Sequence, residues 1–108
     1  MSKKNAMDLD VAWDFEITKI EKRDSAPGTW VNGSLSGHTF CALVFPEHAT
    51  DPEWEIEDSR ITKIWIRREA DQEVVFNWDR GADIEAQTDE AKAIVGFLCA
   101  GLSDHIYG

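Results

Sequence analysis

The strongest constraint on the fold is a pair of short apolar segments joined by two turn residues. Residues 29–35 and 38–45 are rich in β-branched and aromatic side chains, and Ser36-Gly37 lies between them. Glycine supplies the positive φ that a two-residue hairpin turn requires, and Pro46 ends the second segment. The pattern therefore predicts an antiparallel β-hairpin.

Three further strands follow from similar patterns. Apolar residues alternate with polar, mainly acidic residues over 9–18, which favours a half-buried strand with one wet face. Residues 60–67 and 73–78 are typical of two more strands joined by a short polar loop. Residues 79–86 are ambiguous, because Gly81 interrupts them.

One helix is predicted near the C-terminal end of the sequence. Thr88 is a suitable N-cap, acidic residues follow it in the first turn, and the helix is expected to end near Leu102, before a tail over 103–108. At about 100° per residue, one apolar face collects the residues expected to lie on the sheet. These are Ala91, Ile94, Val95, Leu98 and Leu102.

Together these elements define the expected fold class. It is α+β, with an antiparallel meander sheet of about five strands and one C-terminal helix packed on one face. Residues 1–8 are polar without periodicity, so we assign them to a disordered N-terminal tail. Residues 9–108 are assigned to a single α+β domain, which the length of the chain allows.

The charge of the chain argues against several classes of partner. Its 108 residues include 11 Lys and Arg against 21 Asp and Glu, which gives a formal net charge of −10. Nucleic acids and anionic membranes are polyanionic, so we expect neither as a partner. No apolar stretch approaches the roughly 20 residues of a membrane helix, and no secretion signal is recognisable. Cys41 and Cys99 lie in apolar surroundings, which predicts reduced, buried thiols in a cytoplasmic protein.

The sequence contains no pattern typical of a catalytic or metal site. His48 follows Glu47 in an acidic loop, but two neighbouring ligands do not make a metal centre. The segment from Gly33 to Gly37 is superficially like a nucleophile elbow, yet its middle residue is Leu35, and both glycines are explained by hairpin geometry. We therefore predict no catalytic residue, no metal and no cofactor.

The acidic loop over 47–58 has two alternative conformations beside that of a simple solvated loop. In the first, Thr50 caps one helical turn and Trp54 is turned inward. In the second, the loop is extended and an acidic row on one face mimics a phosphate backbone. That row consists of Glu53, Glu55 and Glu57.

A candidate recognition surface follows from strand parity. Ile64 and Ile66 are expected to face the core, which places Lys63, Trp65 and Arg67 on the opposite face of the sheet. The same parity argument adds Trp30 and Asn32 to this face. The predicted ligand- or partner-binding residues are therefore Trp30, Asn32, Lys63, Trp65 and Arg67. The alternative is that Arg and Lys stems merely cover the Trp rings.

The predicted helix has a second face without charge. It consists of Ala93, Gly96, Phe97 and Ala100, and most of these residues are small enough to permit close approach of another backbone. A helix on a sheet normally presents charged residues to water. This face is therefore either covered by the same chain or is the interface of a homodimer.

Residues 28–45 and 59–67 resemble the core of small uncharacterised proteins that are carried by phages and by mobile elements such as integron cassettes. The shared motifs are a Trp-x-Asn-Gly hairpin beginning at Trp30, a Phe-x-Ala-x-Val strand beginning at Phe40, and an Ile-x-Lys-Ile-Trp-Ile strand beginning at Ile61. The resemblance implies a mobile-element origin and a small β-rich fold. It carries over no catalytic residue.

The expected function is that of a non-enzymatic, acidic accessory protein of a mobile element. It would act by contact with another protein, and basic surfaces such as those of host nucleic-acid-binding proteins fit its charge. The alternative is a small-ligand-binding domain that uses Trp30, Lys63, Trp65 and Arg67. An enzyme of unidentified type is the third possibility.

Overall fold

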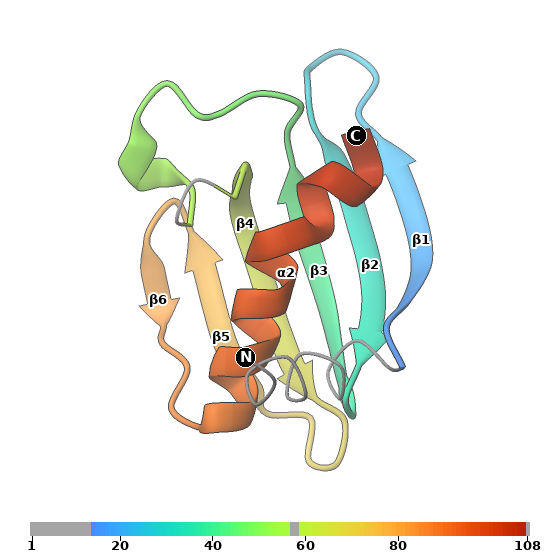
Figure 1. Cartoon of the computed structure of the whole chain (residues 1–108), viewed down its shortest axis with the longest axis vertical. Helices are drawn as coiled ribbons and strands as arrows, with labels where there is room; N and C mark the ends of the chain where they lie inside the picture. The colour runs from blue at the N-terminus through green and yellow to red at the C-terminus, as the bar shows by residue number, and fades with distance from the viewer. Residues whose placement is uncertain (1–13, 57–58, 108) are drawn as a thin grey trace, which may run out of the picture.

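The computed structural model describes residues 14–56 and 59–107. Six strands form one antiparallel sheet in sequence order, and one long helix crosses one face of it (Figure 1). The predicted α+β meander is thus confirmed, with one strand more than expected. The elements are β1 (Glu16–Lys22), β2 (Thr29–Leu35), β3 (His38–Val44), the short 3₁₀ helix η1 (Pro52–Trp54), β4 (Ile61–Arg68), β5 (Val74–Asp79), β6 (Ala82–Ile84) and α2 (Asp89–Tyr107).

The central hairpin of β2 and β3 forms as predicted. Ser36 and Gly37 have φ values of 50° and 72°, and two positive values match the twist of antiparallel strands. The pairing runs without a bulge from Leu35 opposite His38 to Thr29 opposite Val44. Local turn chemistry therefore sets the register of the whole hairpin.

Gly33 has a different role from the one expected. It lies inside β2 rather than in a turn, and a Cβ atom there would be 2.4 Å from the Glu16 carbonyl oxygen and 2.7 Å from Cζ of Phe40. The explanation by hairpin geometry holds for Gly37 and is wrong for Gly33. A side chain is excluded there because β1 and the Phe40 ring occupy the space.

The first strand begins and ends later than predicted. Residues 9–13 lie outside the described part of the chain, as does the tail assigned to 1–8, and Asp14 and Phe15 precede the strand. β1 continues to Lys22 because its backbone pairs with β2 as far as Thr29. An edge strand can be mostly exposed, so polar residues do not end it.

The segment that was ambiguous in the sequence contains the short edge strand β6. Ala82 pairs with Trp78 and Ile84 with Asn77, and all three residues of β6 are exposed. After it, Thr88 accepts a hydrogen bond from the Ala91 amide at 3.0 Å, as expected of an N-cap.

The helix extends further than predicted, so the tail assigned to 103–108 is helical as far as Tyr107. Ser103 is buried, and the Tyr107 hydroxyl lies 2.6 Å from Thr29 Oγ1. The same hydroxyl donates to the Val44 carbonyl at 3.3 Å. Contacts with β2 and β3 therefore stabilise the last turn of α2.

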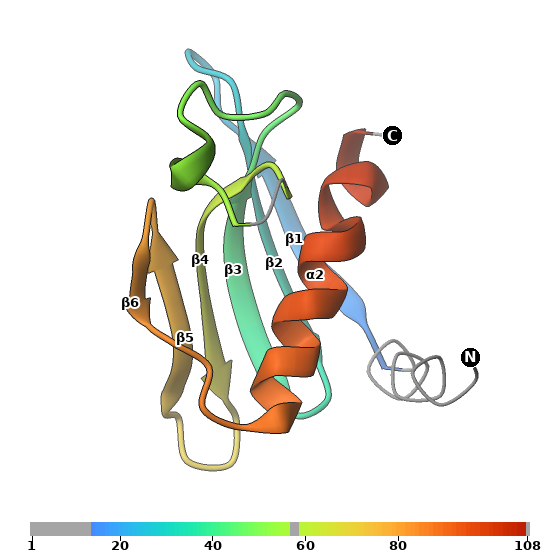
Figure 2. The ribbon, with the colours of Figure 1, turned by 60° about the vertical axis from the view of Figure 1, so that its left-hand side comes forward.

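The core lies between α2 and one face of the sheet, and Figure 2 shows the helix on one side only. The predicted inner face of the helix is confirmed, except that Val95 is half-buried rather than buried. Because α2 covers one face of the sheet, the other face has no helix packed on it, and the loop that carries η1 lies beside it (Figure 2). The largest fully buried core side chains are Val31, Leu35, Phe40, Val44, Ile61, Ile66, Ile94, Leu98 and Leu102.

Candidate functional site

The face of the sheet that α2 leaves uncovered, here called the open face, carries ordered rows of side chains. Strand register places residues directly opposite each other across β2 to β5, and alternate residues share a face. One row consists of Trp30, Leu43, Lys63 and Asp79, and the next consists of Asn32, Cys41, Trp65 and Asn77.

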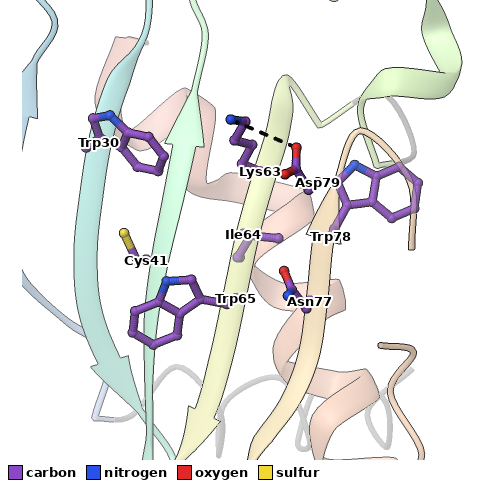
Figure 3. A pocket seen from close by; sticks show the side chains of 8 residues that line it. All are labelled: Trp30, Cys41, Lys63, Ile64, Trp65, Asn77, Trp78 and Asp79. Atoms are coloured by element: carbon purple, nitrogen blue, oxygen red, sulfur yellow. Dashed lines mark ion pairs between the residues drawn. The ribbon is translucent and has the colours of Figure 1, made fainter. Parts of the chain in front are cut away.

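These rows enclose an open hollow of about 370 Å³, the tryptophan hollow (Figure 3). Trp30 and Trp65 are both half-buried, and Cys41 lies between them. Rings in this position offer flat apolar area together with an indole N–H donor. The lining residues are Trp30, Cys41, Lys63, Ile64, Trp65, Asn77, Trp78 and Asp79.

The charges around the tryptophan hollow are loosely paired. Nζ of Lys63 is 3.9 Å from Oδ1 of Asp79, and Nε of Arg80 is 3.7 Å from the same oxygen. Both distances exceed those of hydrogen bonds, and both pairs are largely exposed to solvent. An incoming anion could therefore compete for either cation at small cost.

Arg67 occupies a different position on the same face. Its Cζ atom lies 5.1 Å from the centre of the Trp65 ring, which is cation–π geometry. Arg67 thus packs on the Trp65 ring, as the alternative interpretation of the sequence predicts, and the residue as a whole is half-buried.

The structure places all five predicted recognition residues on the open face. Trp30, Lys63 and Trp65 line the tryptophan hollow, whereas Asn32 and Arg67 lie beside it. The prediction missed the contributions of Cys41 and of β5. Applying the same parity argument to β5 would have placed Asn77 and Asp79 on this face.

Cys41 and Cys99 are both half-buried and outside any disulfide, so the expected full burial is wrong. Partial burial still raises the pKa of the Cys41 thiol above its ordinary value, because desolvation disfavours the thiolate. A neutral thiol is a poor nucleophile. Cys41 therefore contributes an apolar surface to the hollow.

The acidic loop forms one helical turn, η1, as in the first of the two ordered conformations considered, but with a different cap and a different orientation of Trp54. Asp51 rather than Thr50 caps η1, and the Trp54 side chain is turned outward with 43% of its surface exposed. Glu55 is buried instead, which breaks the predicted acidic row, and Glu57 lies outside the described residues. Burial of Glu55 is possible because its carboxylate accepts two hydrogen bonds within the loop.

The second helix face is only partly covered by its own chain. Phe97 packs edge-on against Phe15, with 5.2 Å between ring centres, and Ala93 is half-buried. Gly96 and Ala100 are exposed, and a Cβ atom at Gly96 would meet nothing within 4 Å. Contacts of Phe97 and Ala93 within the chain leave less apolar surface uncovered than the sequence predicted. The homodimer interface stays a prediction.

Among residues 14–56 and 59–107, no three His, Cys, Asp or Glu side chains are grouped so as to hold a metal ion. None of the helices described there is long and apolar enough to cross a membrane.

Comparison with known proteins identifies a family. Neither a curated protein nor a solved structure matches the chain. Residues 29–103 match the family described as Domain of unknown function (DUF7678), and this span runs from the first residue of β2 into the last turns of α2. It therefore includes both the core and the open face, and since it covers more than half of the 108 residues, the protein belongs to the DUF7678 family.

Proposed function

We propose that this protein is a non-enzymatic binding module that contacts another protein through its open face. One observation carries the proposal: Trp30 and Trp65 flank a hollow on a sheet face that the helix leaves uncovered. Interface residues that dominate binding energy are enriched in Trp and Arg and cluster around pockets. Arg67, stacked on Trp65, supplies the third such residue.

The chemistry of the hollow also defines the partner. An aromatic or large aliphatic side chain fits between the two Trp rings, over the neutral Cys41 thiol. Lys63 and Arg67 lie beside this position, so carboxylates that flank the inserted side chain would find cations there. The partner is accordingly an acidic segment with one exposed apolar anchor.

The test uses three fluorescently labelled hexapeptides and fluorescence polarisation. The first is acidic with a central phenylalanine, the second has alanine in place of the phenylalanine, and the third has lysines in place of the acids. We expect only the first to bind, and Trp65→Ala to weaken it at least about tenfold, which is the scale of an interface hot spot. Lys19→Ala is the matched control, because Lys19 lies on the same face but at the β1 edge. Equal binding of all three peptides, or unchanged binding to Trp65→Ala, would contradict the proposal.

A second candidate partner is a basic protein, as the sequence suggested. The net charge of −10 favours it, and the exposed Glu47 and Glu53 in the loop around η1 add local negative charge. In the same experiment, this candidate requires that the lysine peptide binds, that added salt weakens it, and that Trp65→Ala has no effect.

We also propose a mobile element as the genetic setting and the cytoplasm as the place of action. The resemblance of residues 28–45 and 59–67 to phage and integron-cassette proteins supports the setting. Genes for an integrase or phage structural proteins, or cassette attachment sites, should flank the gene. A location among unrelated metabolic genes in several genomes would contradict this proposal.

A further inference from the structure

A second hollow lies at the end of the sheet, beside the loop that carries η1. Its volume is about 450 Å³, and it shares no lining residue with the tryptophan hollow. Four of its residues form apolar walls, namely Pro27, Phe45, Pro46 and Trp54. His48 and Arg80 are its two basic side chains. We call it the histidine hollow.

His48 is oriented by a buried carboxylate. The Glu55 side chain is 1% exposed, and its Oε2 atom lies 2.7 Å from Nδ1 of His48. Its other oxygen, Oε1, accepts a hydrogen bond from the Ala49 amide at 2.8 Å. A buried carboxylate at this distance places the proton on Nδ1, so Nε2 is the nitrogen left for a ligand. When the ring is protonated, Nε2 is a hydrogen-bond donor as well.

Arg80 is held at the hollow by a strained backbone. Its φ is 57°, in the left-handed region that residues with a Cβ atom rarely adopt. Its amide donates to the Thr62 carbonyl at 2.9 Å, which fixes this conformation. Its guanidinium is largely exposed, and the contact with Asp79 at 3.7 Å is too long for a hydrogen bond. Arg80 and Gly81 form the turn between β5 and β6, and this turn brings Arg80 to the lining of the hollow.

We propose that the histidine hollow binds a small carboxylate with an apolar body, such as an aromatic acid. The planar Arg80 guanidinium matches a carboxylate, and Nε2 of His48 donates a second hydrogen bond when the ring is protonated. The apolar body packs between Phe45 and Trp54, whose ring is available because it is 43% exposed. Arg80 supplies a permanent cation to the lining, and its contact with Asp79 at 3.7 Å leaves its guanidinium able to bind an anion. The Glu55 carboxylate is already hydrogen-bonded to His48 and the Ala49 amide, and Glu47, the carboxylate of the lining, is exposed to solvent.

The test is an NMR titration of the ¹⁵N-labelled full chain with sodium benzoate, benzamide and benzylamine. These probes share a phenyl ring and differ in charge, so they separate recognition of the anion from apolar contact alone. We expect saturable shifts with benzoate, at amides near His48, Trp54 and Arg80, and weak or no shifts with the other two. Equal affinity for benzamide, or absence of saturable benzoate shifts at millimolar concentration, would overturn the proposal.

Two substitutions locate the site while preserving the fold. His48→Asn keeps a donor close to the position of Nδ1, so Glu55 stays hydrogen-bonded while Nε2 is lost. Arg80→Asn removes the guanidinium with a residue that tolerates the left-handed region. Each should weaken benzoate binding at least about tenfold, as expected when a charge-assisted contact is lost. Wild-type affinity in both variants would overturn the proposal.

Trp65→Ala is the matched control from the other hollow and should bind benzoate as the parent protein does. It also separates the two proposals, because it weakens peptide binding if the proposed function is right and leaves the histidine hollow intact. Loss of benzoate binding in a folded Trp65→Ala protein would place the ligand in the tryptophan hollow and overturn this inference.

Discussion

Gly33 lies where β1 and the Phe40 ring leave no room for a side chain. A Cβ atom there would be 2.4 Å from a backbone oxygen, which no side-chain rotation can relieve. Gly33→Ala should therefore lower the free energy of unfolding by about 1–3 kcal/mol, the usual cost of overpacking. Urea denaturation measures this change.

Gly96→Ala is the control for that experiment. The space around Gly96 is open and the residue is helical, so alanine should raise the free energy of unfolding by up to about 1 kcal/mol. If both substitutions stabilise the protein, the close contact of Gly33 with β1 is wrong.

At Cys41 the prediction concerns reactivity and its pH dependence. Partial burial raises the thiol pKa, so the folded protein contains less of the reactive thiolate near neutral pH than the unfolded chain does. Alkylation by iodoacetamide should be slow in the native protein and accelerate as the pH rises above the ordinary thiol pKa. Mass spectrometry follows the reaction, and Cys41→Ser identifies the contribution of Cys99.

The same modification reports on the tryptophan hollow. A carbamidomethyl group on Cys41 would occupy space between Trp30 and Trp65, so the modified protein should lose the acidic peptide. Fast alkylation at neutral pH would show that the thiol is more exposed than its position indicates.

At the scale of the element, α2 stabilises the sheet through one narrow stripe of side chains. Leu98 is 1% exposed at the centre of that stripe. Leu98→Ala should lower the free energy of unfolding by about 2–5 kcal/mol, because it removes buried methyl groups and leaves a cavity. Ala100→Ser, on the exposed side of the same helix, should change it by less than about 0.5 kcal/mol. A change below about 1 kcal/mol for Leu98→Ala would mean that the helix does not form the main cover of the core.

The end of α2 provides a second prediction at this scale. Tyr107→Phe removes the hydrogen bonds to Thr29 Oγ1 and the Val44 carbonyl but keeps the ring. We expect a loss of about 0.5–1.5 kcal/mol for a hydrogen bond of this kind, together with faster amide hydrogen exchange in the last helical turn. If amide hydrogen exchange in the last turn is unchanged, the intrinsic helix propensity of these residues is enough to extend α2 to Tyr107.

At the scale of the whole molecule, the exposed Gly96 and Ala100 predict self-association. A two-fold dimer could bury them against their own copies, although the net charge of −10 opposes association at low salt. Analytical ultracentrifugation should therefore detect a dimer at high micromolar concentration. Gly96→Glu should yield a folded monomer, because the new carboxylate would be buried without a partner in that interface. A monomeric parent protein would contradict the dimer.

Features with a local cause were predictable from the sequence alone. The Ser36-Gly37 turn and the Thr88 cap are chemical signals carried by neighbouring residues, so the central hairpin and the start of α2 were predicted closely. Strand alternation has a strict period of two, which predicted that Trp30 and Trp65 share the face opposite the core.

Features that depend on contacts between residues distant in the sequence were decided only by the tertiary structure. β1 continues to Lys22 through pairing with β2, and α2 continues to Tyr107 through contacts with Thr29 and Val44. Likewise, an acidic run predicts a solvated loop, because a lone carboxylate is costly to bury. Glu55 is buried nonetheless, since the folded loop brings His48 and the Ala49 amide to its two oxygens, and that compensation exists only once the chain has folded.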